Sequence, residues 1–200
     1  MKTVAVIMAG GKSSRMGRDK ALLPLDGRPL LSALAHRWRG VFDGLVISAD
    51  TRARFAALDL GGARIVEDTR PGAGPLAGLE AVMTAVPADR YFLTAVDLPF
   101  GEPALALELS ERMGGADVCL IQREGRGWEP LFALYARRCL PAISAALDRG
   151  SAPSTAACSP LSPSRRCRRR PCLASSWTGS SSMSIHRRSG RSPSDFRPGQ

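Results

Sequence analysis

The residues with the clearest chemical potential lie between Met8 and Lys20, in the segment MAGGKSSRMGRDK. An apolar run ends there in two glycines, and hydroxyl and basic side chains follow. Glycines let backbone N–H groups approach phosphate oxygens closely, and Ser13 and Ser14 can donate hydrogen bonds. Arg15 and Lys20 can neutralise negative charge. The spacing matches neither the Walker loop nor the Rossmann dinucleotide fingerprint, so we predict a phosphate-binding loop of another type.

A second candidate is Asp97, which follows the apolar run YFLTAV and precedes Leu-Pro. Its carboxylate should stand at the carboxyl end of a central strand and face the same crevice as the glycine loop. A Mg²⁺ ion between this carboxylate and a triphosphate would neutralise charge that builds on a leaving pyrophosphate. A strand-ending aspartate that caps the next turn remains the alternative.

A third candidate is Asp68, which closes the run RIVED and is followed by the glycine- and proline-rich loop from Pro71 to Gly78. Backbone groups of such a loop can contact the edges of a purine. A carboxylate can accept hydrogen bonds from a ribose hydroxyl or an exocyclic amine. An ordinary surface turn is the alternative.

The elements that must position these residues alternate in type along the chain. Buried-strand patterns predict strands, and apolar residues at helical spacing predict helices. The expected strands are 3–8, 45–48, 64–66, 91–96, 117–122 and 131–135, and the expected helices are 29–39, 79–85, 105–113 and 140–147. This alternation predicts a Rossmann-like, doubly wound, mostly parallel α/β sheet, with its ligand beyond the carboxyl ends of the strands.

The composition divides the chain near residue 150. Residues 1–150 carry 19 Lys and Arg against 17 Asp and Glu, whereas residues 151–200 carry nine Arg and one acid. The first part is long enough for one domain with a real core. The second part is rich in Ser, Arg and Pro and lacks periodicity, so we expect a disordered tail. The chain has no run of 18 apolar residues, and we expect a soluble, cytoplasmic protein.

Taken together, these segments resemble the MobA-like nucleotidyltransferases, the family of the molybdenum cofactor guanylyltransferases. The resemblance covers residues 3–149 and consists of four segments in the family's order: MAGGKSSRMGRDKALLPLDGRPLL, VEDTRPGAGPLAGL, TAVDLPF and EPLFALYARRCLPAI. It implies a fold of the nucleotide-diphospho-sugar transferase type. It also implies transfer of GMP from GTP to molybdopterin, which forms the guanine dinucleotide cofactor and releases pyrophosphate.

The resemblance also assigns roles to residues. Asp97 would bind Mg²⁺ as well as nucleotide, and Arg15, Lys20 and Asp97 would be the catalytic residues. The phosphate of molybdopterin would attack the α-phosphorus in line, so catalysis would depend on positioning and charge neutralisation. Ser48 stands where the family commonly has an asparagine. The residues implied to bind GTP are Met8, Ala9, Gly10, Lys20, Asp68 and Asp97.

The expected partners are GTP and molybdopterin, with transient contacts to cofactor insertion proteins or apo-molybdoenzymes and with neither membrane nor nucleic acid. Two alternatives within the fold are a molybdopterin cytidylyltransferase and a sugar-phosphate nucleotidyltransferase. An alternative of another class is a nucleic-acid-binding protein that uses the basic cluster SRRCRRRP of the tail. A further alternative is an inactive, truncated homologue.

The tail departs from the family, whose members end in an Asn-Val-Asn-Thr-Pro segment. Codons can be chosen for Ser176 to Arg187 that read VDGIFFNVNTP when translated from the third base. We therefore hypothesise a frameshift near Gly150. Reading the coding DNA across codons 145–155 tests this hypothesis. A single intact frame that uses other codons in the tail would contradict it.

Overall fold

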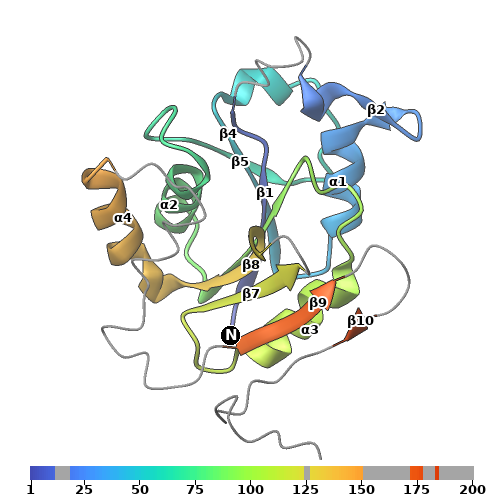
Figure 1. Cartoon of the computed structure of the whole chain (residues 1–200). Coiled ribbons are helices and arrows are strands. Elements are labelled where there is room, and N and C mark those ends of the chain that lie inside the picture. The colour runs from blue at the N-terminus through green and yellow to red at the C-terminus, as the bar shows by residue number, and fades with distance from the viewer. Residues whose placement is uncertain (12–18, 124–126, 151–171, 178–182, 185–200) are drawn as a thin grey trace, which may run out of the picture.

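The computed structural model of the chain describes residues 1–11, 19–123, 127–150, 172–177 and 183–184 (Figure 1). The strands of the main sheet are β1 (Thr3–Met8), β4 (Gly44–Ala49), β5 (Arg64–Glu67), β6 (Arg90–Ala95), β7 (Val118–Arg123), β8 (Gly127–Ala136), β9 (Cys172–Trp177) and β10 (Met183–Ser184). The α-helices are α1 (Leu30–Trp38), α2 (Pro75–Ala85), α3 (Pro103–Met113) and α4 (Leu140–Asp148).

The sheet is mostly parallel, as predicted, and its strand order is β10-β9-β7-β8-β6-β1-β4-β5. β1 pairs in parallel with β4 on one side and with β6 on the other, and β5 continues the parallel arrangement beyond β4. β8 is antiparallel to both β6 and β7. Because β1, β4, β5 and β6 run in the same direction, their carboxyl ends meet at one edge of the sheet.

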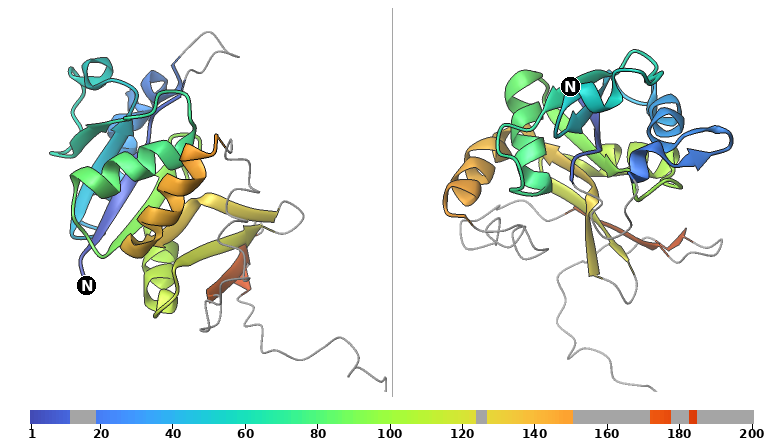
Figure 2. Two further views of the ribbon diagram at one scale, coloured as in Figure 1. Left: turned by 90° about the vertical axis from the view of Figure 1, so that its left-hand side faces the viewer. Right: turned by 90° about the horizontal axis from the view of Figure 1, so that it is seen from above.

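Helices cover both faces of the sheet, so the domain has three layers (Figures 1 and 2). α2 and α4 lie on one face, and α1 and α3 lie on the other. Within α1, the buried residues recur at helical spacing and form one apolar stripe: Leu31, Leu34, Ala35 and Trp38. This is the expected architecture of a doubly wound α/β domain.

Aromatic rings fill the space between the sheet and α1. The ring centroids of Trp38 and Phe92 lie 4.9 Å apart, and Phe92 meets Phe132 edge to face at 5.0 Å. Trp38 and Phe92 are fully buried, and both come from elements that the sequence predicts. Ring pairs in these geometries add to the free energy of burial, so this cluster fixes α1 against β6 and β8.

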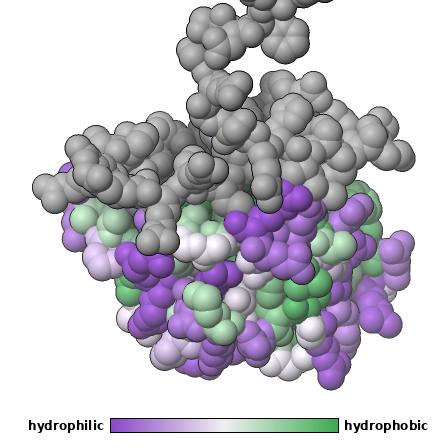
Figure 3. All heavy atoms as spheres, turned by 90° about the horizontal axis from the view of Figure 1, so that it is seen from below, coloured by the Kyte–Doolittle hydropathy of each residue, from purple (hydrophilic) through white to green (hydrophobic). Residues whose placement is uncertain are grey.

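The amino edge of the sheet is closed by structural carboxylates. The backbone N–H of Thr3 donates to Asp43 at 2.7 Å, and the N–H of Lys2 donates to Asp89 at 2.7 Å. These bonds occupy donors at the start of β1. Polar side chains cover most of the described surface seen from this side (Figure 3). The amino edge is thereby tied by bonds within the protein itself.

The predicted loop from Pro71 to Gly78 is wrong in its second half, because α2 begins at Pro75. Proline is well suited to the first turn of a helix, where its missing N–H has no partner to lose, and Gly74 before it adopts a φ of 83°. A short hairpin of β2 (Pro24–Leu25) and β3 (Arg28–Pro29) was not predicted. Its Asp-Gly turn has positive φ at both central residues, which is typical of two-residue hairpin loops.

The tail contains regular structure that the sequence analysis did not expect. β9 pairs in parallel with β7, and β10 pairs with β9. β7 would otherwise present an open edge, and the run CLASSW offers apolar and aromatic residues suited to a strand. The other residues of 151–200 lie outside the described ranges, and a domain boundary at residue 150 stays a prediction. No helix among the described residues has the length and apolar character needed to span a bilayer.

The aromatic cluster yields a prediction about stability. Replacing Phe92 with alanine should lower the free energy of unfolding by about 3–5 kcal/mol, because it removes a fully buried ring and leaves a cavity. Urea denaturation followed by circular dichroism measures this change. Leu107→Ala serves as the control, because Leu107 is 43% exposed on α3 and its removal should change stability by less than about 1 kcal/mol. Equal losses in both variants would contradict the assigned core.

Candidate active site

The candidate site is built where hydrogen bonding between neighbouring strands continues one residue past their ends. The N–H of Ala9 donates to the carbonyl of Ser48 at 2.8 Å, and the N–H of Asp68 donates to the carbonyl of Ala49 at 2.9 Å. On the other side of β1, the N–H of Val96 donates to the carbonyl of Met8 at 3.3 Å. Asp68 itself therefore lies at one carboxyl edge together with Gly10 and Asp97, which directly follow Ala9 and Val96.

The side chain of Asp68 is oriented by a hydrogen bond from Ser48 on the neighbouring strand β4. The buried hydroxyl of Ser48 donates to Oδ1 of Asp68 at 2.8 Å. Burial raises the pKa of the Asp68 carboxyl above its ordinary value; the Ser48 hydrogen bond opposes this shift, and the nearby negative charge of Asp50 adds to it. The carboxyl is thus oriented by one fixed donor and retains acceptor capacity for a ligand.

Two glycines make room around this carboxyl. A Cβ at Gly78, in the first turns of α2, would overlap the Ser48 hydroxyl and would lie 2.7 Å from the Met8 methyl group and 3.0 Å from Oδ1 of Asp68. A Cβ at Gly10 would lie 3.1 Å from Oδ2 of the same carboxyl. Bare backbone can therefore approach Asp68 from two directions, which a bulky residue at either position would prevent.

Lys20 is the first residue of a short 3-10 helix, η1 (Lys20–Leu22). Asp19 caps this helix by accepting a hydrogen bond from the N–H of Ala21 at 3.0 Å. Lys20 is partly exposed and Asp97 is exposed. Within the described part of the chain, neither side chain has a hydrogen-bond or ion-pair partner.

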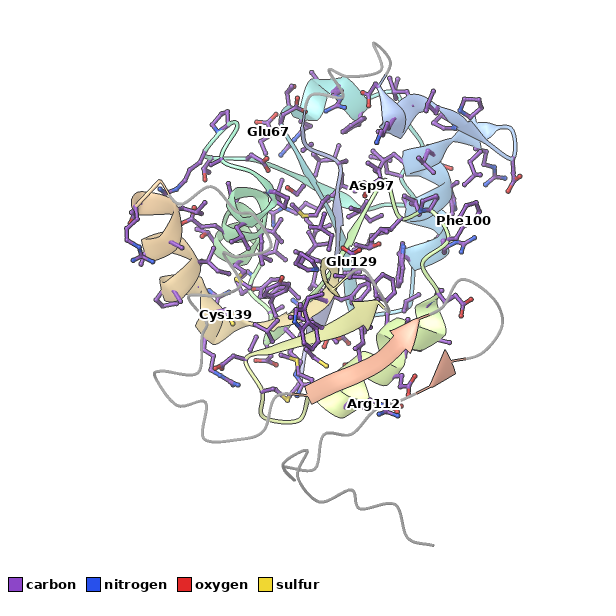
Figure 4. All side chains as sticks on the ribbon, viewed as in Figure 1. Glu67, Asp97, Phe100, Arg112, Glu129 and Cys139 are labelled. Atoms are coloured by element: carbon purple, nitrogen blue, oxygen red, sulfur yellow. The ribbon has the colours of Figure 1, made fainter. Side chains whose placement is uncertain are left out.

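A cavity of about 160 Å³ opens beside Asp97. Apolar side chains line most of it, and Asp97, Glu102 and Glu129 contribute the carboxylates. Asp97, Phe100 and Glu129 are labelled in Figure 4, and Phe100 is 69% exposed. The residues that line the cavity are Asp97, Leu98, Pro99, Phe100, Gly101, Glu102, Leu105, Ile121, Glu129 and Phe132.

The carboxylates at this edge are the candidate ligands for a metal ion. Among the described residues, no group of three or more His, Cys, Asp or Glu side chains is arranged to hold one. This arrangement does not suit a metal held by the protein alone. A divalent metal ion that is shared with substrate phosphates needs only one or two carboxylates from the protein, and Asp97 is an exposed carboxylate at this edge.

Most of the predicted site residues lie at one edge of the sheet. The structure brings Met8, Ala9, Gly10 and Asp68 together at the ends of β1, β4 and β5, and Asp97 follows β6 at the same edge. Arg15, Ser13 and Ser14 lie outside the described residues. Their roles, and those of the other site residues, stay predictions.

Three charged residues beside the glycine loop were not predicted from the sequence. Asp19 and Asp50 both pair with Arg54, at distances of 2.6 and 2.8 Å. Arg54 belongs to a second short 3-10 helix, η2 (Arg52–Phe55). The only signal in the sequence was the excess of charge near these positions, and charge alone does not reveal partners from different segments.

A mostly parallel sheet with a glycine loop, a lysine and two aspartates at its carboxyl edge defines an α/β enzyme of the nucleotidyltransferase class. The chain belongs to the family described as the MobA-like NTP transferase domain, which matches residues 5–160. The predicted family and fold type are confirmed.

Two relatives carry the name probable molybdenum cofactor guanylyltransferase. The one from Pelotomaculum thermopropionicum is 35% identical over 147 residues, which cover 74% of this chain and 70% of the relative. The one from Deinococcus radiodurans is 39% identical over 148 residues, which cover 73% and 74%. The solved molybdopterin-guanine dinucleotide biosynthesis protein A of Archaeoglobus fulgidus has a similar fold, with a TM-score of 0.64, 21% identity and coverage of 78% of each chain.

The raised pKa of Asp68 yields a prediction about pH. Because the folded-state pKa lies above the unfolded one, the folded state binds this proton more tightly, and stability falls as the pH rises through that range. Asp68→Asn removes the free-energy cost of burying a charged carboxylate and retains an acceptor for the Ser48 hydroxyl. The variant should therefore melt at a higher temperature than the wild type at pH 7, and the difference should shrink as the pH falls from the raised pKa of Asp68 toward about 3.9, the ordinary Asp value, and disappear below it.

Thermal melts across this pH range measure the effect, and Asp26→Asn is the control, because Asp26 lies exposed in the β2–β3 turn. A lower melting temperature for Asp68→Asn than for the wild type at pH 7 would sink the assignment. Isothermal titration of the same variant with GTP should show weaker binding, because the amide has lost the negative charge offered to the nucleotide.

Proposed function

We propose that this enzyme transfers GMP from GTP to molybdopterin in the cytoplasm, forming molybdopterin guanine dinucleotide and releasing pyrophosphate. The observation that carries the proposal is the agreement between the named relatives and the carboxyl edge of the sheet. Two relatives that are 35% and 39% identical to this chain over most of its length are both named guanylyltransferases. The edge offers bare backbone beside Asp68 and an unpaired Lys20 and Asp97 within the described residues.

GTP would lie across this edge, with its phosphates at the Gly10 backbone and at the ammonium of Lys20. Asp68, oriented by Ser48, would accept a hydrogen bond from the ribose or the guanine. Gly78 and Gly10 let the backbone pack directly against this carboxyl, which a Cβ at either position would crowd. Arg15 is proposed to add a second positive charge, as the family resemblance implies.

The reaction would be a direct displacement. An oxygen of the molybdopterin phosphate forms a bond to the α-phosphorus of GTP, and the bond between the α-phosphorus and the bridging oxygen breaks, so that pyrophosphate leaves with that electron pair. Mg²⁺, held by Asp97 and the nucleotide phosphates, would supply neutralisation of the charge on the leaving group. The part of this chain would be to hold the two substrates in line and to place the charge of Lys20 near the phosphates.

The acceptor would enter from the cavity beside Asp97. Its apolar lining and the exposed ring of Phe100 suit a flat heterocycle such as a pterin, and Asp97 forms part of its wall.

The buried thiol of Cys139 is not in a disulfide, which agrees with a reducing compartment such as the cytoplasm. Transient contacts with cofactor insertion proteins or apo-molybdoenzymes are part of the same proposal.

Titration calorimetry with GTP and Mg²⁺ tests the nucleotide site. Lys20→Ala and Asp97→Asn should each weaken GTP binding by about 10- to 100-fold, because each removes a charge-assisted contact. Lys2→Ala is the matched control, since Lys2 lies at the amino end of β1 and the variant should bind as the wild type does. Unchanged binding in both site variants would overturn the site assignment.

Two further measurements complete this test. CTP replaces GTP in the same titration, and binding of CTP that equals or exceeds that of GTP would favour the cytidylyltransferase alternative. Release of pyrophosphate from GTP in the presence of molybdopterin then reports turnover. A chain that binds GTP tightly but releases no pyrophosphate would correspond to the inactive homologue.

A further inference from the structure

Arg54 joins two stretches of chain that frame the glycine loop. Its Nε donates to Oδ2 of Asp19 at 2.6 Å, and its Nη2 donates to Oδ1 of the same carboxylate at 2.6 Å. Its Nη1 donates to the backbone carbonyl of Ala9 at 3.3 Å and to Asp50 at 2.8 Å. One guanidinium group therefore contacts Ala9, where the chain leaves β1, and Asp19, which directly precedes Lys20.

The environment of Arg54 does not suit a direct phosphate ligand. Two carboxylates already share its charge, and only 19% of its side chain is exposed. The guanidinium carbon lies 4.8 Å from the centre of the buried Phe55 ring, which supports the group from below. Lys20, in contrast, has no partner among the described residues. Arg54 is therefore occupied by carboxylates of the protein, whereas Lys20 is the cation that we assign to the phosphates.

Asp19 connects the ion pair to the backbone at Lys20. The carboxylate that receives two hydrogen bonds from Arg54 also accepts one from the N–H of Ala21 at 3.0 Å. The hydrogen bonds that Arg54 donates to Asp19 lower the pKa of Asp19 and raise the pKa of Arg54. The pair is thus charged at neutral pH, and its bidentate geometry fixes direction as well as distance.

We propose that Arg54 is a positioning residue that sets the separation of Gly10 and Lys20, and through it the fit of the site to a nucleoside triphosphate. This inference rests on the proposed function, and it adds a residue that does not itself touch the substrate. The guanidinium holds Ala9 and Asp19 together, so that the backbone at Gly10 and the ammonium of Lys20 face the same phosphates. A lysine at position 54 keeps the charge but cannot reproduce the fork of donors.

The test compares Arg54→Lys with the wild-type full-length chain. Titration with GTP and Mg²⁺ should show an affinity loss of about tenfold, whereas binding of guanosine, which lacks phosphates, should change by less than about twofold. NMR hydrogen exchange without nucleotide should be faster at the amides of Gly10 and Ala21. Asp19→Asn should act in the same direction, and the double variant should lose less than the two single losses combined.

Arg137→Lys is the matched control for a general loss of stability. Arg137 donates to the carbonyl of Met83 at 2.8 Å and to the hydroxyl of Tyr91 at 2.9 Å, and it lies next to β6 near the amino edge of the sheet. Its replacement should lower the melting temperature while leaving the affinity for GTP and the exchange at Gly10 unchanged. Equal effects of Arg54→Lys and Arg137→Lys on GTP affinity would overturn the proposal.

The remaining outcomes distinguish a failure of the positioning role of Arg54 from a failure of the proposed function. Unchanged exchange at Gly10 and Ala21 in Arg54→Lys would show that the arginine does not hold these positions. Faster exchange with unchanged GTP affinity would make the contact structural only, which also overturns the proposal. A wild-type chain that fails to bind GTP would refute the proposed function, whereas the exchange measurement would still report whether Arg54 holds the two positions.

Discussion

The pairing of β1 with strands on both of its sides is the constraint on which the rest of the structure depends. β1 is fully buried, and β4 and β6 supply partners for its backbone on either side. Because buried backbone groups must be hydrogen-bonded, the three parallel strands pair along their length, and their carboxyl ends lie side by side. Gly10, Asp68 and Asp97 come from segments far apart in the sequence, and the shared register brings them to one edge.

Charge is distributed unevenly around that edge. Arg54 is neutralised by Asp19 and Asp50 and supported by Phe55, so its role is one of internal organisation. Lys20 and Asp97 have no such partners within the described chain. Ion pairs restrict geometry when both members are held, and unpaired charges attract ligands. The candidate site thus combines an ion-paired arginine with two charged side chains that have no such partner among the described residues.

The sequence predicted the strands well, because buried parallel strands are continuous apolar runs with clear ends. It predicted the positions of Asp68 and Asp97 for the same reason: each follows such a run directly. The direction of β8 could not be predicted, since periodicity carries no information about whether a neighbour runs parallel or antiparallel. The start of α2 was missed because glycine and proline dominate that segment, although proline at a first helical turn is favourable.

Arg54 lay beyond prediction for a different reason. Its partners at Ala9, Asp19 and Asp50 come from three segments, and their meeting depends on the packing of η2 beside the end of β1. No local pattern records such a meeting. The Asp-Gly turn of the β2–β3 hairpin, in contrast, was visible in the sequence and was overlooked.

The central place of β1 also has a consequence for synthesis on the ribosome. β1 is made before both of its partners, and the second of them, β6, begins only at Arg90. At translation rates of roughly 5–20 residues per second, several seconds pass before β6 exists. During that time one side of an apolar strand has no partner, which exposes the nascent chain to aggregation and makes it a natural client for chaperones. The same pairing that assembles the site in the finished protein therefore leaves β1 incompletely paired while the chain is being made.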